Sequence, residues 1–142
     1  MKPEKKRPPK YRLNDDDYCF VCGRANPIGL KLSFELDLSR HEVFTMFQPE
    51  RIHQGWTNKL HGGILTSILD EAMVNAAYLS DMPAVTGELT IRFRAPADTT
   101  QRLKVVGRVT EVRAKFLKAS GECLTEDGTR VAEATALLIR MS

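Results

Sequence analysis

Hydrophobic and polar positions alternate in several segments of the chain and recur every three or four residues in one. The alternation from Leu30 to Leu38, and again over residues 43–48, predicts two half-buried strands. Between residues 64 and 79 the apolar side chains follow offsets of three and four, which predicts a helix with a wide apolar face. Such a helix must be covered by other elements of the fold.

The part of the chain after Pro83 is rich in β-branched residues. Its alternating pattern predicts four further strands, over residues 85–93, 103–112, 116–124 and 130–139. Asp127-Gly128 favours a hairpin between the last two, because this pair readily adopts positive φ values. The order of elements indicates an α+β fold, with one curved antiparallel β-sheet wrapped around one long central α-helix.

Length and charge indicate one domain with a basic tail. A chain of 142 residues is long enough for one hydrophobic core. Residues 1–12 hold six basic side chains against Glu4, and their three prolines disfavour a helix. We therefore expect a flexible basic arm over residues 1–18 and a folded domain over residues 19–142. Because the basic residues gather in this tail, nucleic acid is not expected as a partner.

Apolar runs and cysteines bear on the location of the protein. No run approaches the length of a membrane span, and the first residues lack a secretory signal, so we expect a cytoplasmic protein. Cys19, Cys22 and Cys123 are odd in number, which argues against a disulfide framework. Cys19 and Cys22 have the spacing of half a zinc site, but no matching second pair follows. We expect two small buried side chains there and no metal.

His61-Gly62-Gly63 follows a polar loop and leads directly into the predicted helix. The first N–H groups of a helix have no internal partner, and the positive end of its dipole favours negative charge. Glycine also lets a ligand approach the backbone closely. The segment is therefore either an oxyanion hole for a carbonyl under attack or a glycine-rich helix start without a ligand.

Asp70 and Glu71 interrupt a helix that is otherwise nearly all apolar. Charged side chains are rarely buried unless they are paired or functional. Asp70 lies two turns beyond Gly62, about 12 Å along the axis, so the two cannot touch within one helix. A symmetric dimer would bring Asp70 of one subunit opposite Gly62 of the other. Glu71 fits the alternative of a carboxylate that faces solvent.

Residues 61–72, with the sequence HGGILTSILDEA, resemble the catalytic segment of a known family. They are similar to the His-Gly-Gly loop and helix carboxylate of the hotdog-fold thioesterases, in the PaaI-like branch of the 4-hydroxybenzoyl-CoA thioesterase superfamily. Residues 86–96, TGELTIRFRAP, resemble the family's strand after the helix, and residues 22–30 resemble the N-terminal loop of one subgroup. The resemblance covers residues 19–140 and implies the hotdog fold.

The resemblance implies an acyl-CoA thioesterase, which hydrolyses an acyl-CoA to the free acid and coenzyme A. The amide of Gly62 would polarise the thioester carbonyl, and Asp70 would act as general base or nucleophile. Thr86 would orient the attacking water. His61 would contact the thioester end of the substrate or would only hold the loop through a hydrogen bond.

The remaining expected contacts concern substrate binding. Many family members carry Asn or Gln where this chain has Gly55, so Gln54 beside it is expected to contact the substrate, together with Gly63. The family also implies a homo-oligomer, homodimer or homotetramer, with the site at the dimer interface. No cofactor is expected, because coenzyme A is part of the substrate. Basic side chains on the matching strands are candidates for its phosphates: Arg92, Arg94, Arg113 and Lys115.

Two other functions remain open from the sequence. The same fold can serve as a non-catalytic module that binds acyl-CoA or an acyl carrier, but the presence of Asp70 favours an enzyme. A hotdog-fold dehydratase would use a differently spaced acid and base, usually with a central His. The acyl group is not readable, because several side chains suit either an aromatic or an aliphatic pocket: Trp56, Met73, Tyr78 and Met82.

Overall fold

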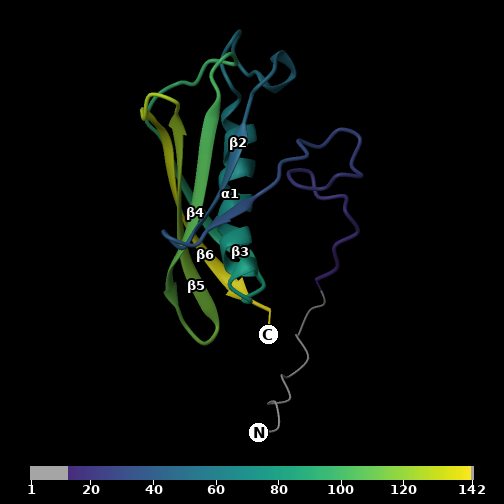
Figure 1. The fold of residues 1–142 in the computed structure, drawn as a ribbon, viewed down its shortest axis with the longest axis vertical. Helices are drawn as coiled ribbons and strands as arrows, with labels where there is room; N and C mark the ends of the chain where they lie inside the picture. Colours follow the sequence, from purple (N-terminus) through teal and green to yellow (C-terminus); the bar gives the residue numbers. More distant parts are fainter. Residues whose placement is uncertain (1–12, 142) are drawn as a thin grey trace, which may run out of the picture.

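Six antiparallel strands and one long helix make up the fold (Figure 1). The structure is a computed structural model that describes residues 13–141. Its elements are β1 (Glu35–Asp37), β2 (Glu42–Phe47), a 3-10 turn η1 (Arg51–His53), α1 (Gly62–Leu79), β3 (Ala84–Phe93), β4 (Leu103–Val112), β5 (Phe116–Thr125) and β6 (Arg130–Arg140). The strand order is β1-β2-β4-β5-β6-β3, which leaves the ten-residue strand β3 at an edge of the sheet.

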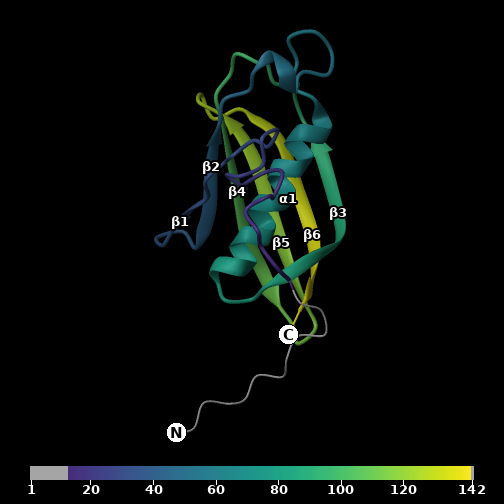
Figure 2. The same ribbon diagram turned by 90° about the vertical axis from the view of Figure 1, so that its right-hand side faces the viewer.

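The sheet, α1 and an N-terminal loop form three layers (Figures 1 and 2). One face of the curved sheet packs on α1, and residues 17–32, which we call the cysteine loop, cross the other side of the helix. Val21 in this loop is 5% exposed and belongs to the same core as the helix. The N–H of Leu30 bonds to the carbonyl of Phe20 at 2.8 Å, which closes the loop on itself.

The backbone of α1 approaches the sheet closely at Gly107 in β4. A Cβ atom added there would lie 2.4 Å from the carbonyl oxygen of Ala72 and 2.8 Å from the backbone nitrogen of Met73. Gly121 of β5 pairs directly with Gly107, and a Cβ there would lie 3.4 Å from a methyl group of Leu69. Two paired glycines therefore form a shallow trough in which the helix lies.

The predicted fold class is confirmed, and so are the helix and five of the six predicted strands, whose ends agree within two residues. The predicted hairpin between the last two strands is present. Gly128 adopts a φ of 85°, and its N–H bonds to the carbonyl of Thr125 at 3.0 Å.

The prediction of a strand from Leu30 to Leu38 was wrong in extent, because only Glu35–Asp37 pairs with β2. Lys31 has a φ of 53°, which interrupts the extended backbone, and the N–H of Leu32 bonds to Val21 in the cysteine loop instead. The alternation ahead of β1 still reflects packing against the core. Leu38, which the pattern placed on the buried face, is 74% exposed.

The chain termini are described in part. Residues 1–12 of the predicted basic arm lie outside the described residues, so its flexibility stays a prediction. The carbonyl of Asp17 accepts a hydrogen bond from Ala25 N–H at 3.0 Å, within the cysteine loop.

None of the helices in the described residues combines the length and the apolarity that crossing a bilayer demands.

We predict that Gly107→Ala destabilises the protein by about 1–3 kcal/mol or more, because the added methyl group meets helix backbone that cannot rotate away. Urea unfolding followed by circular dichroism measures the loss. Gly128→Asn is the matched control, since nothing lies within 4 Å of a Cβ there and Asn tolerates positive φ. Equal small losses in the two variants would contradict the close approach of helix and sheet.

Candidate functional site

Asp70 and Thr86 meet between the middle of α1 and the beginning of β3. The Thr86 hydroxyl donates a hydrogen bond to the Asp70 carboxylate, with Oγ1 and Oδ1 2.5 Å apart. Both side chains are half-buried. A short hydrogen bond to a carboxylate fixes its orientation, so one oxygen of Asp70 is held by Thr86 while the other is available for chemistry.

A β-bulge directs Thr86 toward the helix. The pairing of β3 with β6 shifts between Thr86 and Glu88, so Gly87 is the extra residue. Thr86 pairs with the buried Leu138, whereas beyond the bulge it is Leu89 that packs on the core. Without the extra residue, strict alternation would direct either Thr86 or the apolar positions after it away from α1.

His61 is the N-cap of α1. Its Nδ1 accepts a hydrogen bond from the N–H of Gly63 at 2.8 Å, so the remaining ring nitrogen carries the proton. A Cβ at Gly63 would lie 3.0 Å from the His61 ring, and one at Gly62 would lie 3.2 Å from the tip of Phe93. Both glycines thus allow close contacts. In residues 13–141 the Gly62 N–H has no acceptor, as expected for the first residue of a helix.

A cavity of about 540 Å³ opens beside Gly62. Its walls include the apolar side chains of Leu65, Phe93 and Val131. Trp56, on the loop before the helix, also contributes and is 88% exposed. An apolar group that entered this cavity would reach the start of α1, where the Gly62 N–H lies.

The structure does not bring all the predicted catalytic residues together in one chain. Gly62 and Asp70 share α1 at a separation of about 12 Å. Gly62 lies against Phe93 at the end of β3, whereas Asp70 bonds to Thr86 near its beginning. The two halves of the predicted site are therefore at opposite ends of the same edge strand.

The sequence profile of the thioesterase superfamily matches residues 57–132, a segment that includes Gly62, Asp70 and Thr86. The chain belongs to the thioesterase superfamily. A curated relative from Schizosaccharomyces pombe, an uncharacterized protein, is 32% identical over 85 residues, which are 58% of this chain and 49% of the relative. The chain therefore spans about half the length of the curated relative that it matches.

Solved thioesterase structures share the fold of this chain. A thioesterase superfamily protein superposes with a TM-score of 0.81 at 22% identity, over 87% of this chain and 60% of that one. The PaaI protein of the Escherichia coli phenylacetic acid degradation operon gives 0.71 at 18%, over 80% and 81%. A hypothetical thioesterase from Streptococcus pneumoniae, solved with coenzyme A, gives 0.71 at 14%, over 77% and 84%. The resemblance to PaaI-like thioesterases is thereby confirmed.

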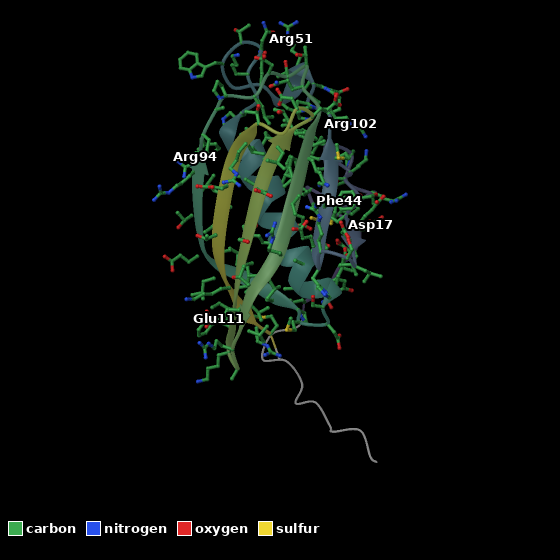
Figure 3. The ribbon with its side chains drawn as sticks, turned by 60° about the vertical axis from the view of Figure 1, so that its left-hand side comes forward. Asp17, Phe44, Arg51, Arg94, Arg102 and Glu111 are labelled. Atoms are coloured by element: carbon green, nitrogen blue, oxygen red, sulfur yellow. The ribbon has the colours of Figure 1, made fainter. Side chains whose placement is uncertain are left out.

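The four basic residues predicted to bind phosphates do not form one patch in this thioesterase superfamily member. Figure 3 shows Arg94 near one end of the sheet and Glu111, which pairs with Arg113, near the other. The length of a ten-residue strand separates them, about 30 Å. Arg92 lines a separate hollow of about 280 Å³ with residues of β4, β5 and β6. Within residues 13–141, the exposed Lys115 forms no ion pair.

Two of these cations already have carboxylate partners. A hydrogen bond from Arg94 lowers the pKa of Glu133 below its ordinary value, and one from Arg113 does the same for Glu111. Both pairs are exposed, so each contributes little to stability and an incoming phosphate can compete for the guanidinium.

Gln54 and Gly55 lie on the loop ahead of α1. The Gln54 side chain accepts a hydrogen bond from the Asn58 N–H at 3.1 Å, and its backbone bridges to Leu60. A Cβ at Gly55 would lie 3.3 Å from the His61 ring. Gln54 thus shapes the loop that leads to His61, and its contact with substrate stays a prediction.

Glu71 does not match the alternative of a carboxylate that faces solvent. Its side chain is half-buried under the cysteine loop, where the Cys22 thiol donates to Glu71 Oε1 at 3.1 Å. Asn75, one turn later, donates to the same oxygen at 3.2 Å. Sequence reasoning missed this cluster because 49 residues separate Cys22 from Glu71, and no local pattern connects them.

We predict that His61→Ala lowers the free energy of unfolding by about 1 kcal/mol, because the N–H of Gly63 loses its acceptor. His61→Asn should recover most of this loss, since Asn caps helices well. Thermal and urea unfolding measure both variants. Equal losses in the two would show that ring contacts, rather than the cap, are what His61 contributes.

Proposed function

We propose that this protein is an acyl-CoA thioesterase that works as a homodimer, with each active site built from Gly62 of one protomer and Asp70 of the other. The observation that carries the proposal is the position of the two halves along β3. The Asp70 and Thr86 pair lies near the beginning of this edge strand, and Gly62 lies against Phe93 at its end.

An antiparallel pairing of two β3 edges would bring these halves together. A twofold axis across the middle of β3 places the beginning of one strand beside the end of the other. Asp70 of one protomer would then face Gly62 of its partner, and two equivalent sites would form. The same pairing covers a ten-residue edge strand whose backbone groups would otherwise be open to association with other chains.

The Gly62 N–H would stabilise the charge that develops on the thioester oxygen. It is the first N–H of α1, lacks an acceptor within the described residues and lies beside the cavity. The positive end of the helix dipole adds to its effect. Removal of one such donor typically costs about 10²–10³-fold in kcat.

Asp70 would supply the second half of the reaction. As a general base it takes a proton from water, and the hydroxyl oxygen forms a bond to the carbonyl carbon. As a nucleophile it forms that bond itself, and water then hydrolyses the acyl-enzyme anhydride. In both cases the bond between carbon and sulfur breaks, and coenzyme A leaves as a thiolate that takes up a proton. The Thr86 hydroxyl holds Asp70 in position for either role.

The dimer would also gather the basic side chains. With the β3 edges antiparallel, the end of one protomer that carries Arg113 and Lys115 lies beside the end of the other that carries Arg94. Exposed guanidinium and ammonium groups at this junction suit the phosphates of coenzyme A. The apolar walls of the cavity beside Gly62 suit the acyl or pantetheine portion.

We predict that the purified protein releases thiol from acyl-CoA substrates and that Asp70→Asn lowers kcat by about 10²–10⁴-fold. A panel of aromatic and aliphatic acyl-CoAs with a thiol-reactive dye provides the measurement. Glu126→Gln, at an exposed carboxylate on the β5–β6 turn, is the matched control and should retain full activity. Turnover that survives Asp70→Asn would remove Asp70 from the mechanism. Acyl-CoA binding without any turnover would favour a binding module.

Mixed dimers test the shared site directly. Gly62→Pro deletes the proposed donor at the first helical position, where the backbone suits proline because the preceding His61 already has an extended ψ of 129°. The added Cβ would lie 3.2 Å from the tip of Phe93, whose exposed ring has room to move aside. We predict that Gly62→Pro and Asp70→Asn are each inactive and that their mixture, after dissociation and reassociation, recovers about a quarter of wild-type activity. Half of the dimers would be mixed, and each mixed dimer would hold one intact site. No recovery in proven mixed dimers would contradict a site shared between Gly62 of one protomer and Asp70 of the other.

A further inference from the structure

A second cluster of reactive side chains lies on a different flank of α1 from Asp70. The Sγ atoms of Cys19 and Cys22 lie 3.6 Å and 3.1 Å from Oε1 of Glu71. All three atoms are within 4.8 Å of one another, and all three residues are half-buried. Two sulfur atoms and a carboxylate oxygen thus converge from the cysteine loop and the helix.

The backbone of the cysteine loop holds the two cysteines in a tight turn. The N–H of Gly23 bonds to the carbonyl of Cys19 at 2.8 Å, which closes the turn. A Cβ at Gly23 would lie only 2.4 Å from the backbone nitrogen of Cys19, so no other residue fits after the second cysteine. Between the cysteines, Val21 is buried in the same core as the helix, and this contact holds the turn against α1. The two sulfur atoms are therefore preorganised.

The charge of the cluster is not balanced by a cation among the described residues. Glu71 forms no ion pair with any basic side chain within residues 13–141. Its partners there are the two thiols and the amide of Asn75, which donates to Oε1 at 3.2 Å and to the backbone carbonyl of Glu71 at 3.0 Å. A carboxylate in these surroundings is suited to a bound cation.

We propose that Cys19, Cys22 and Glu71 bind one zinc ion, which fastens the cysteine loop to α1. Two thiolates and a carboxylate are a donor set that favours zinc over magnesium or calcium. Water would complete the four ligands. Asn75 would keep the carboxylate oriented, as hydrogen-bond partners of metal ligands commonly do.

The distances between the donor atoms agree with a tetrahedral zinc ion. Bonds of about 2.3 Å to sulfur and 2.0 Å to oxygen place sulfur and oxygen ligands about 3.5 Å apart. The observed separations, 3.1 Å and 3.6 Å, lie on either side of that value. Binding therefore requires little movement of the loop or of the helix.

Binding changes the protonation of the cluster without any redox step. Each thiol releases a proton to solvent when its sulfur bonds to zinc. Two thiolates, one carboxylate and a doubly charged cation leave the site with one net negative charge. Because a site of this kind is absent from the unfolded chain, the binding free energy adds to the stability of the fold.

The test uses the full chain purified under reducing conditions without chelators. We expect about one zinc ion per chain by elemental analysis. After exchange with cobalt(II), we expect charge-transfer absorption from thiolate ligands and the visible bands of a tetrahedral ion. Cys22→Ser should abolish the thiolate absorption or reduce it by half, and Glu71→Gln should weaken binding at least tenfold in competition with a metal indicator. Circular dichroism establishes that each variant is folded.

Two variants serve as controls. Cys123→Ala should keep the metal, because the Cys123 side chain is fully buried in the sheet and burial raises the pKa of its thiol to about 12. Asp70→Asn should also keep the metal although it stops hydrolysis, which separates this proposal from the proposed function. Alkylation of the native protein should label two cysteines only after a chelator is added.

Three outcomes would overturn the proposal. One is folded protein without zinc that takes up no cobalt(II) while both thiols stay open to alkylation. A second is a disulfide between Cys19 and Cys22 that persists through purification under reducing conditions. A third is a Glu71→Gln variant that binds metal as tightly as the wild type, which would remove the third ligand.

Discussion

The close packing of α1 on the sheet at Gly107 determines the directions in which the side chains of α1 point. A helix normally stands off a sheet because side chains fill the space between them. Here the paired glycines, Gly107 and Gly121, let the backbone of the helix approach the strands directly. The rotation of α1 about its axis is thereby restricted, because only one stripe of the helix fits the trough. The direction in which each other side chain of α1 points follows from this contact.

Asp70 and Glu71 show how much depends on that restricted rotation. Consecutive helical residues differ by about 100° in direction, so these two carboxylates leave the helix on different flanks. Asp70 reaches Thr86 on the edge strand, and Glu71 reaches the cysteines of the loop. A rotation of the helix by one position would take both carboxylates away from these partners. The packing of the core and the chemistry of both flanks are therefore set by one arrangement.

The sequence predicted most of the fold and half of the candidate site, for physical reasons. Periodicity revealed α1 and five strands because each has one continuous apolar face, whereas the positive φ at Lys31 interrupts a strand without changing the alternation around it. The helix start at Gly62 and the carboxylate at Asp70 were predictable because they are local features. The bulge at Gly87 and the cysteine cluster with Glu71 depend on pairings between distant segments, and no local pattern carries them.

One wall of the cavity beside Gly62 contains the residue that dominates the fluorescence of this protein. The chain contains a single tryptophan, Trp56, and it stands at the mouth of this cavity with 88% of its surface exposed. Tryptophan dominates the near-ultraviolet emission of most proteins, and here that emission originates from one loop ahead of α1. The intrinsic fluorescence of the native protein is consequently a local signal from the mouth of the cavity and carries little information about the buried core.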